Sequence, residues 1–215
     1  MILIRKEGGS QLKFASYIPI ILASGSPRRK ELLESLGIQF EINPSNVDEH
    51  VNFTDSDFQG YVQLLAERKG DAVSKTAQES LVIAADTIVV YNGEVYPKPA
   101  TPEEAVNFLE TFAGNTHSVY TGVCLQYRGR TVVFSEETRV TFKPLDKQLI
   151  KAYVNSGDPM DKAGGYGIQT AGALLVEKID GDYLNVVGLP LSKLVEVMRD
   201  EGFIELIGGE LADDS

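Results

Sequence analysis

Residues 22–30 form the part of the chain best suited to hold an anion. Apolar residues give way at Ser24 to a short polar turn, and Ser26 is a typical N-cap for the helix that follows. The free N–H groups of a first helical turn favour negative charge nearby. The positive side chains of Arg28 and Arg29 are therefore unfavourable at this end of the helix dipole, unless an anion binds there. The pattern therefore predicts a phosphate site, although a capped helix with exposed arginines is a common alternative.

A carboxylate in an unusual setting is the second candidate. Asp86 interrupts the apolar run of residues 81–90, which indicates a strand buried on both faces. An ionised carboxylate there needs a cation, hydrogen-bond donors or a catalytic purpose, so we favour a functional Asp86 over a structural one. Asp48 and Glu49 lie in an acidic loop after the predicted second strand. Such loops are usually only solvated, but the position of this one keeps the pair as candidates.

Two lysines could add positive charge near these groups. Helical spacing places Lys69 between Leu65 and Val73 on the apolar face of a predicted helix, where an ammonium must reach solvent or meet an anion. Lys98 lies in a stiff Pro-Lys-Pro segment close to the end of the strand that carries the buried carboxylate. Residues 161–169 hold three glycines after an Asp-Lys pair, which suits either a close ligand or an ordinary turn.

Alternating and helical patterns supply the scaffold for these residues. Strands are expected over 18–22, 38–42, 81–90, 94–96, 118–125, 131–134, 138–142, and 173–176 paired with 183–187; helices are expected after caps at Ser26, at Thr54 or Ser56, at Thr101 and at Asp146, and over 191–198. We expect a loose N-terminal extension over residues 1–17, a single domain over 18–203 and a mobile acidic tail over 204–215.

The composition limits the classes of function. The 215 residues are 43% hydrophobic and 24% charged, within the range of a folded soluble domain. A net charge of −11 repels nucleic acid and acidic membranes, so a small charged anion fits better than a polymer. No apolar run approaches the ~20 residues that span a bilayer. The single Cys124 cannot form an internal disulfide and suits packing in a reducing compartment, so we expect a cytoplasmic protein.

Together these motifs resemble the Maf-like proteins. The resemblance runs from about residue 20 to residue 203 and rests on residues 22–29, 47–49, 67–69, 85–87, 98–99, 119–122, 161–169 and 185–190. It implies an α/β fold with a mixed twisted central β-sheet flanked by helices, in two lobes with a cleft, similar to the inosine triphosphate pyrophosphatases. It also implies hydrolysis of nucleoside triphosphates to monophosphate and pyrophosphate, a house-cleaning activity that uses a divalent cation.

The resemblance assigns roles to individual residues. It makes Asp86 the catalytic proton acceptor and Glu49 a carboxylate that shares the metal with it. The residues around the nucleotide would be Ser24, Arg28, Arg29, Lys69, Lys98 and Gln169. Mg²⁺ or Mn²⁺ suits a site of carboxylate and phosphate oxygens. Whether Asp86 acts as the base or as a metal ligand stays open.

Three positions bear on the choice of base. Within the resemblance, Arg28, Thr87 and Gln169 separate a dTTP and UTP class from a 7-methyl-GTP class, and the trio present here resembles the pyrimidine class. Gln169 offers a donor and an acceptor to the edge of uracil or thymine, and Thr87 offers a hydroxyl and a methyl group. A methylated guanine is a larger cationic ring that favours an aromatic face, and the chain has no tryptophan.

Two other functions stay open at this point: a 7-methyl-GTP pyrophosphatase, and a nucleotide-binding regulator of cell division without significant turnover. A regulator would need the cations but not the embedded Asp86, which favours an enzyme. The expected partner is a nucleoside triphosphate, without a nucleic acid polymer or a membrane. The sequence leaves open whether the chain forms a homodimer.

Overall fold

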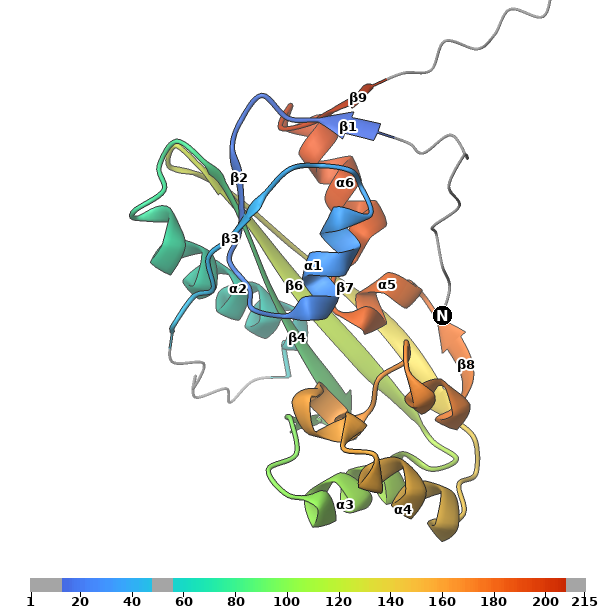
Figure 1. Cartoon of the computed structure of the whole chain (residues 1–215). Coiled ribbons are helices and arrows are strands. Elements are labelled where there is room, and N and C mark those ends of the chain that lie inside the picture. Colours follow the sequence, from blue (N-terminus) through green and yellow to red (C-terminus); the bar gives the residue numbers. More distant parts are fainter. Residues whose placement is uncertain (1–12, 48–55, 208–215) are drawn as a thin grey trace, which may run out of the picture.

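The computed structural model describes residues 13–47 and 56–207, and Figure 1 shows their arrangement. The elements in chain order are β1 (Lys13–Ala15), β2 (Ile20–Leu22), α1 (Pro27–Glu34), β3 (Glu41–Ile42), α2 (Phe58–Ser74), β4 (Leu81–Tyr91), β5 (Glu94–Tyr96), α3 (Pro102–Phe112), β6 (Thr116–Tyr127), β7 (Arg130–Phe142), α4 (Lys147–Asn155), η1 (Asp158–Asp161), η2 (Ala163–Gly165), η3 (Ala171–Leu175), β8 (Val176–Asp180), α5 (Tyr183–Val187), α6 (Leu191–Asp200) and β9 (Glu205–Ile207).

The main sheet has seven strands in the order β3-β2-β4-β6-β7-β8, with β5 paired to β4. Strand β2 runs parallel to β3 and β4, whereas the other pairs are antiparallel. The long strands β4, β6 and β7 run through the whole molecule (Figure 1). The predicted α/β fold with a mixed central sheet flanked by helices is therefore confirmed.

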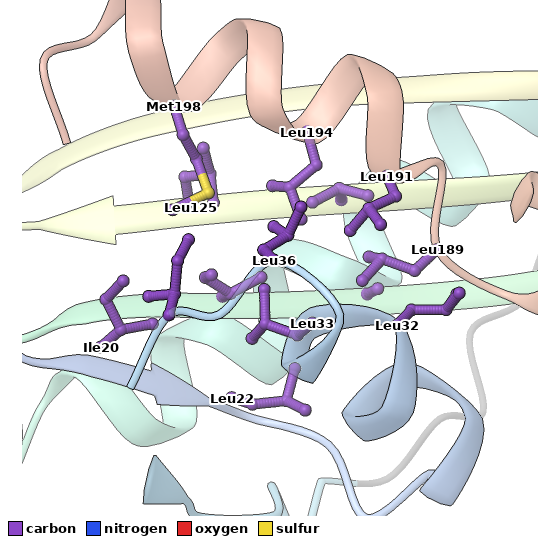
Figure 2. Close-up of a cluster of buried hydrophobic side chains, with 14 of the residues drawn as sticks. Ile20, Leu22, Leu32, Leu33, Leu36, Leu125, Leu189, Leu191, Leu194 and Met198 are labelled. Atoms are coloured by element: carbon purple, nitrogen blue, oxygen red, sulfur yellow. The ribbon is translucent and has the colours of Figure 1, made fainter. Parts of the chain in front are cut away.

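Side chains alternate between the two faces of β4, and each face is covered differently. Helix α2 covers one face, where Ala66 and Val73 pack with Val82, Ala84 and other buried side chains. Helices α1 and α6 cover the opposite face, where their leucines and Met198 meet residues of β2, β4 and β6 (Figure 2). Burial of these apolar faces, rather than helix propensity, holds the layers together.

A second apolar core lies farther along the long strands. It joins Val89 of β4 and Val119 of β6 to α3 and α4, and it includes Phe112 and Tyr153. The two cores divide the chain into two lobes that share β4, β6 and β7 (Figure 1). Thr87 lies on the same face of β4 as both cores, between Ala85 of the first and Val89 of the second.

The second core encloses a histidine. His117 is 2% exposed, stacks on Phe112, and its Nε2 lies 2.8 Å from the hydroxyl of Tyr166. Its Nδ1 has no hydrogen-bond partner within residues 13–47 and 56–207. Burial lowers the pKa of this ring to about 3 from an ordinary value of 6.5. His117 is therefore neutral in the folded protein at neutral pH.

This histidine should make the protein sensitive to acid. Below pH 6.5 the unfolded chain binds a proton that folded His117 does not, so stability falls as the pH drops from 6.5 toward 3. Between pH 7 and about pH 4.5, we expect wild type to lose about 2–3 kcal/mol more unfolding free energy than His117→Gln, as measured by urea unfolding. Equal losses in the two proteins would contradict this prediction.

Helix α2 lies unusually close to the sheet at Gly122 of β6. A Cβ atom at this position would meet the carbonyl oxygen of Val62 at 2.2 Å. At Gly70, on α2 itself, the nearest atom is the flexible amide end of Gln126 at 3.1 Å. The close approach at Gly122 is a contact with backbone, which cannot move without moving the helix.

The two glycines should therefore respond differently to substitution. We expect Gly122→Ala to lower the unfolding free energy by about 1–3 kcal/mol, because the added methyl group pushes α2 away from β6. Gly70→Ala should change it by less than about 1 kcal/mol, since the better helix propensity of alanine offsets a contact that can adjust. Urea unfolding of both variants checks this order, and a larger loss at Gly70 would contradict it.

Most predicted helix starts are confirmed. The side chains that cap α1, α3 and α4 accept backbone N–H groups at 3.5, 3.2 and 2.8 Å, and they belong to Ser26, Thr101 and Asp146. Helix α2 differs, because its N-cap is Asp57, whose Oδ1 accepts from the N–H of Gly60 at 2.9 Å. The apolar pattern located this helix but not its first turn.

Three other expectations need correction. The strands predicted over 131–134 and 138–142 are one strand, β7, because its pairing with β6 continues through the polar residues between them. Residues 183–187 form the helix α5 rather than a strand, since the side chain of Asp182 caps it. Residues 173–175 belong to the 3-10 helix η3, and β8 begins only at Val176, where it pairs with β7.

The expected loose extension and mobile tail also differ from the structure in part. Strands β1 and β9 form a two-stranded antiparallel sheet in which Phe14 pairs with Leu206. Segments from the two ends of the chain thus meet, which the sequence alone could not show. The other residues of the predicted extension and tail, 1–12 and 208–215, lie outside the described ranges. None of the described helices has the length and apolar character needed to cross a membrane.

Candidate active site

A gap in strand pairing leaves part of one edge of β4 without a partner strand in the described parts of the chain. Strand β2 pairs with β4 only as far as Leu22 opposite Ile83, and β5 begins its pairing at Val89. Among the described strands, none pairs with that side of β4 over residues 84–88. Asp86 and Thr87 lie in this gap and point to opposite faces of the sheet, because successive side chains of a strand alternate. The two residues therefore border the gap from opposite faces of the sheet.

The N-terminus of α1 begins beside this gap. The N–H of Ala23 bonds to the carbonyl of Ile83 at 2.8 Å, which fixes the end of β2 against β4. The next residues turn into the helix, and the hydroxyl of Ser24 accepts from the N–H of Ser26 at 3.2 Å. The predicted strand, turn and helix start are confirmed. Open α/β sheets commonly bind ligands at the carboxyl ends of their parallel strands, and β2 ends here.

Arg29 lies across the same gap, and its guanidinium donates hydrogen bonds to three of the described residues. Its Nε donates to the carbonyl of Gly188 at 2.8 Å, its Nη1 to Ser24 Oγ at 3.2 Å, and its Nη2 to Thr87 Oγ1 at 3.0 Å. The hydroxyl of Thr87 also lies 2.9 Å from that of Thr121 on β6. The sequence predicted Ser24, Arg29 and Thr87 as site residues, and the structure brings all three together.

Thr121 and Gly188 were not predicted from the sequence. Thr121 is fully buried and stands directly opposite Thr87 in the register of β4 and β6. A polar residue within the apolar run of residues 119–125 was the available signal for it. Gly188 acts through its backbone carbonyl, and the signal for it was its place within residues 185–190, one of the segments on which the resemblance rests.

Asp86 and Lys69 form a buried ion pair on the other face of β4. Lys69 Nζ lies 2.5 Å from Asp86 Oδ1, and the two residues are 8% and 7% exposed. The anion expected for Lys69 is thus the very carboxylate predicted to be catalytic. Breaking a buried pair by removing one member is costly, so the pair must be considered in any variant of either residue.

Arg28 is bound to Asp161 in the glycine-rich segment, residues 161–169. Its Nη1 lies 2.7 Å from Asp161 Oδ2, and its Nη2 donates to the carbonyl of Asp161 at 3.3 Å. Partial burial alone would raise the pKa of Asp161, but hydrogen bonds from Lys162 and Arg28 outweigh it and lower that pKa to about 2. An internal carboxylate therefore accounts for one of the two arginines that oppose the dipole of α1.

The other predicted site residues that the structure describes lie outside this network of contacts at the gap. Lys98 is exposed, and its neighbour Pro97 accepts from the N–H of Gly164 at 3.0 Å, which ties this segment to η2. Gln169 is also exposed. Within the described residues, no hydrogen bond or ion pair joins Lys98 or Gln169 to the other predicted site residues. Glu49 lies outside the described residues, so its predicted metal role stays a prediction.

The residues of the gap are compatible with a divalent cation. Mg²⁺ commonly binds through one or two carboxylates together with substrate phosphates, and Asp86 offers such a carboxylate. In the parts of the chain that the structure describes, no three His, Cys, Asp or Glu side chains come together. Because Asp86 Oδ1 lies 2.5 Å from Lys69 Nζ, a divalent cation at Asp86 would have to use the other carboxylate oxygen or replace Lys69. A pocket of about 600 Å³ lies elsewhere, between α6 and β9, and none of the predicted site residues lines it.

A comparison with protein families matches residues 19–201 to the family described as Maf-like protein. This match covers most of the chain and includes the gap, the start of α1 and the glycine-rich segment. The chain belongs to the Maf-like family. The resemblance predicted from its motifs is thereby confirmed.

Three curated relatives of this Maf-like protein share one name. A protein of Thermosipho africanus named dTTP/UTP pyrophosphatase is 46% identical over 89% of this chain and 98% of its own length. Proteins with the same name from Halalkalibacterium halodurans and Bacillus cereus strain AH820 are 46% and 48% identical over 86% and 84% of this chain, and over 97% and 94% of their own lengths.

One solved structure shows a weaker likeness to the Maf-like chain. It is titled a nucleoside-triphosphatase / dITP/XTP pyrophosphatase from Mycobacterium abscessus and matches with a TM-score of 0.37 at 15% identity. The match covers 60% of this chain and 76% of that chain. A likeness at this level adds nothing to the family assignment.

Proposed function

We propose that this Maf-like protein is a nucleoside triphosphate pyrophosphatase that hydrolyses dTTP and UTP to the monophosphate and pyrophosphate. Relatives with that name align with it over most of their length. The observation that carries the proposal is the placement of Asp86 and Arg29 on either side of the same gap in β4. Removal of modified pyrimidine triphosphates would be its house-cleaning role.

The basic groups at the gap suit a triphosphate, which carries about four negative charges. The N-terminus of α1 and the guanidinium of Arg29 face the same place, and Arg29 is already oriented by its three hydrogen bonds. Arg28, Lys69 and Lys98 would supply further positive charge. Because Arg28 is paired with Asp161, it would have to keep or exchange that partner when the phosphates bind.

Asp86 is the group proposed to accept the proton of the attacking water. In this proposal the water attacks the α-phosphorus, and pyrophosphate leaves against the arginines. Lys69 would stay beside Asp86 and receive either the carboxylate or a phosphate oxygen as its partner. A divalent cation held by Asp86, Glu49 and the substrate oxygens would neutralise part of the phosphate charge.

Base selection is proposed to depend on Arg28, Thr87 and Gln169. The exposed amide of Gln169 can offer one donor and one acceptor to uracil or thymine. The hydroxyl of Thr87 is occupied by Arg29 and Thr121, so we propose that Thr87 acts mainly by orienting Arg29 rather than by contact with the base.

A turnover panel tests this function. Pyrophosphate release should be measured for dTTP, UTP, CTP, dATP, GTP and 7-methyl-GTP with Mg²⁺ or Mn²⁺. We expect the highest kcat/KM for dTTP and UTP. A clear preference for 7-methyl-GTP would favour the second substrate class, and nucleotide binding without pyrophosphate release would favour the regulator.

A cytoplasmic location is also proposed. Cys124 is fully buried, and burial raises the pKa of its thiol to about 12, as expected of an unreactive packing residue. Such a thiol suits a reducing compartment.

A further inference from the structure

Lys162 is a buried cation to which the proposed mechanism gives no role. It is 8% exposed, and its ammonium donates to the carbonyl of Asp158 at 2.6 Å, to Asp158 Oδ1 at 3.1 Å and to Asp161 Oδ1 at 2.6 Å. An ammonium has three donors, so these bonds use its full capacity. Lys162 therefore acts as a junction between two carboxylates rather than as a phosphate ligand.

The first connection of this junction leads to Arg28. Asp161 divides its two oxygens, because Oδ1 accepts from Lys162 and Oδ2 accepts from Arg28 at 2.7 Å. The guanidinium of Arg28 is thus placed by a carboxylate that Lys162 itself orients. This connection crosses from η1 to the first turn of α1.

The second connection leads to residues 167–170, the loop that carries Gln169 and is called the Gln169 loop below. Asp158 Oδ2 accepts from Thr170 Oγ1 at 2.5 Å and from the hydroxyl of Tyr153 at 2.6 Å. That hydroxyl in turn accepts from the N–H of Gly167 at 3.0 Å. The residues anchored here bracket Gln169 in the chain.

The loop also packs directly on the side chain of Lys162. A Cβ atom at Gly167 would meet Lys162 Cε at 2.5 Å and Thr170 Oγ1 at 2.7 Å. The backbone of the loop at Gly167 therefore lies in close contact with the side chain of Lys162. One buried side chain, that of Lys162, thus positions both Arg28 and the Gln169 loop through hydrogen bonds and packing.

We propose that Lys162 is a positioning residue for base selection, which holds Arg28 through Asp161 and the Gln169 loop through Asp158. This inference rests on the proposed function, because it takes Arg28 and Gln169 as nucleotide-binding residues. Loss of the ammonium would release both together, so discrimination between bases would suffer more than turnover of the best substrate.

The test compares Lys162→Met with wild type. Methionine keeps most of the buried stem and removes the three donors. We expect the ratio of kcat/KM for UTP over GTP to fall by about tenfold or more, with a smaller loss of kcat for UTP because Arg29, whose described bonds do not involve Lys162, keeps its place. The matched control is Lys193→Met, since Lys193 also bonds to a carbonyl and a carboxylate, at 3.0 and 3.3 Å, but in α6 and β7. Its ratio should stay at the wild-type value.

Two further variants separate the connections and keep the test valid if Lys162→Met does not fold. Asp161→Asn weakens the connection to Arg28, and Thr170→Val removes the hydroxyl that bonds to Asp158 Oδ2 at 2.5 Å and to the carbonyl of Gly167 at 2.9 Å. Both positions are exposed, so both proteins should fold. Each should lower the UTP over GTP ratio in part. A folded Lys162→Met or a pair of single variants with an unchanged ratio would overturn the proposal.

Binding measurements distinguish failure of this inference from failure of the proposed function. Dissociation constants for UTP and GTP need no turnover, and their ratio should fall in Lys162→Met as the kinetic ratio does. A wild type that releases no pyrophosphate would refute the enzyme but leave this ratio measurable. A wild type that binds UTP and GTP equally, or a variant that weakens both equally, would refute the positioning role.

Discussion

Asp86→Asn should lower pyrophosphate release from UTP by about 10²–10⁴-fold while the protein stays folded. Asparagine keeps the shape of the side chain and an oxygen that Lys69 can bond, but it cannot accept a proton from water. The substitution replaces the buried hydrogen bond between the Asp86 carboxylate and Lys69 with a weaker bond to a neutral amide. The unfolding free energy should therefore fall by about 1–3 kcal/mol. Turnover and urea unfolding should be measured on the same preparations.

The matched control for this variant is Asp71→Asn. Asp71 lies on α2, the helix that carries Lys69, and its Oδ1 accepts from Gln126 Nε2 at 2.5 Å. It has no proposed part in the reaction, so its loss should leave turnover within about threefold of wild type. A folded Asp86→Asn with near-normal turnover would show that Asp86 is only the structural partner of Lys69.

Arg29→Ala is expected to lower kcat/KM for UTP by about 10²–10³-fold, which corresponds to roughly 3–4 kcal/mol of lost transition-state stabilisation. The guanidinium is oriented before substrate arrives by its bonds to Gly188, Ser24 and Thr87, so its position at the gap is set by the fold. Arg29→Lys should recover little of this loss, because an ammonium cannot make the same three divergent bonds.

Lys30→Ala is the control for the arginine variant. It removes the same charge from the next residue of α1, but Lys30 is exposed and its nearest acidic partner is Glu34 at 3.6 Å in a surface pair. Surface pairs of this kind contribute about 0–1 kcal/mol, and turnover should not change. An equal loss of kcat/KM in both variants would indicate a general electrostatic effect instead of a specific contact by Arg29.

The sequence predicted the elements that bear the site better than the contacts within it. Ser26 and Pro27 located the start of α1, and the apolar run around Asp86 located a buried strand, because both signals are local along the chain. Lys69 could be placed on an apolar helix face by spacing alone. Its partner could not, since the pairing of α2 with β4 depends on the tertiary fold.

Long-range contacts account for most of what sequence reasoning missed. Asp161 lies 133 positions from Arg28, and Thr121 faces Thr87 only because β4 and β6 pair in one register. The same holds for β1 and β9, which join segments from the two ends of the chain. The strand predicted over residues 183–187 was wrong for a different reason. Their apolar side chains suit a strand, but the cap at Asp182 starts a helix.

The position of attack on the triphosphate tests the central claim most directly. UTP should be hydrolysed by the wild-type protein in water enriched in oxygen-18, with Mg²⁺ present, and all phosphorus-containing products should be analysed by mass spectrometry. Attack at the α-phosphorus predicts UMP and pyrophosphate in equal amounts, with the heavy oxygen in UMP. Formation of UDP and orthophosphate, heavy oxygen in the pyrophosphate, or the absence of hydrolysis would contradict a pyrophosphatase built around Asp86 and Arg29.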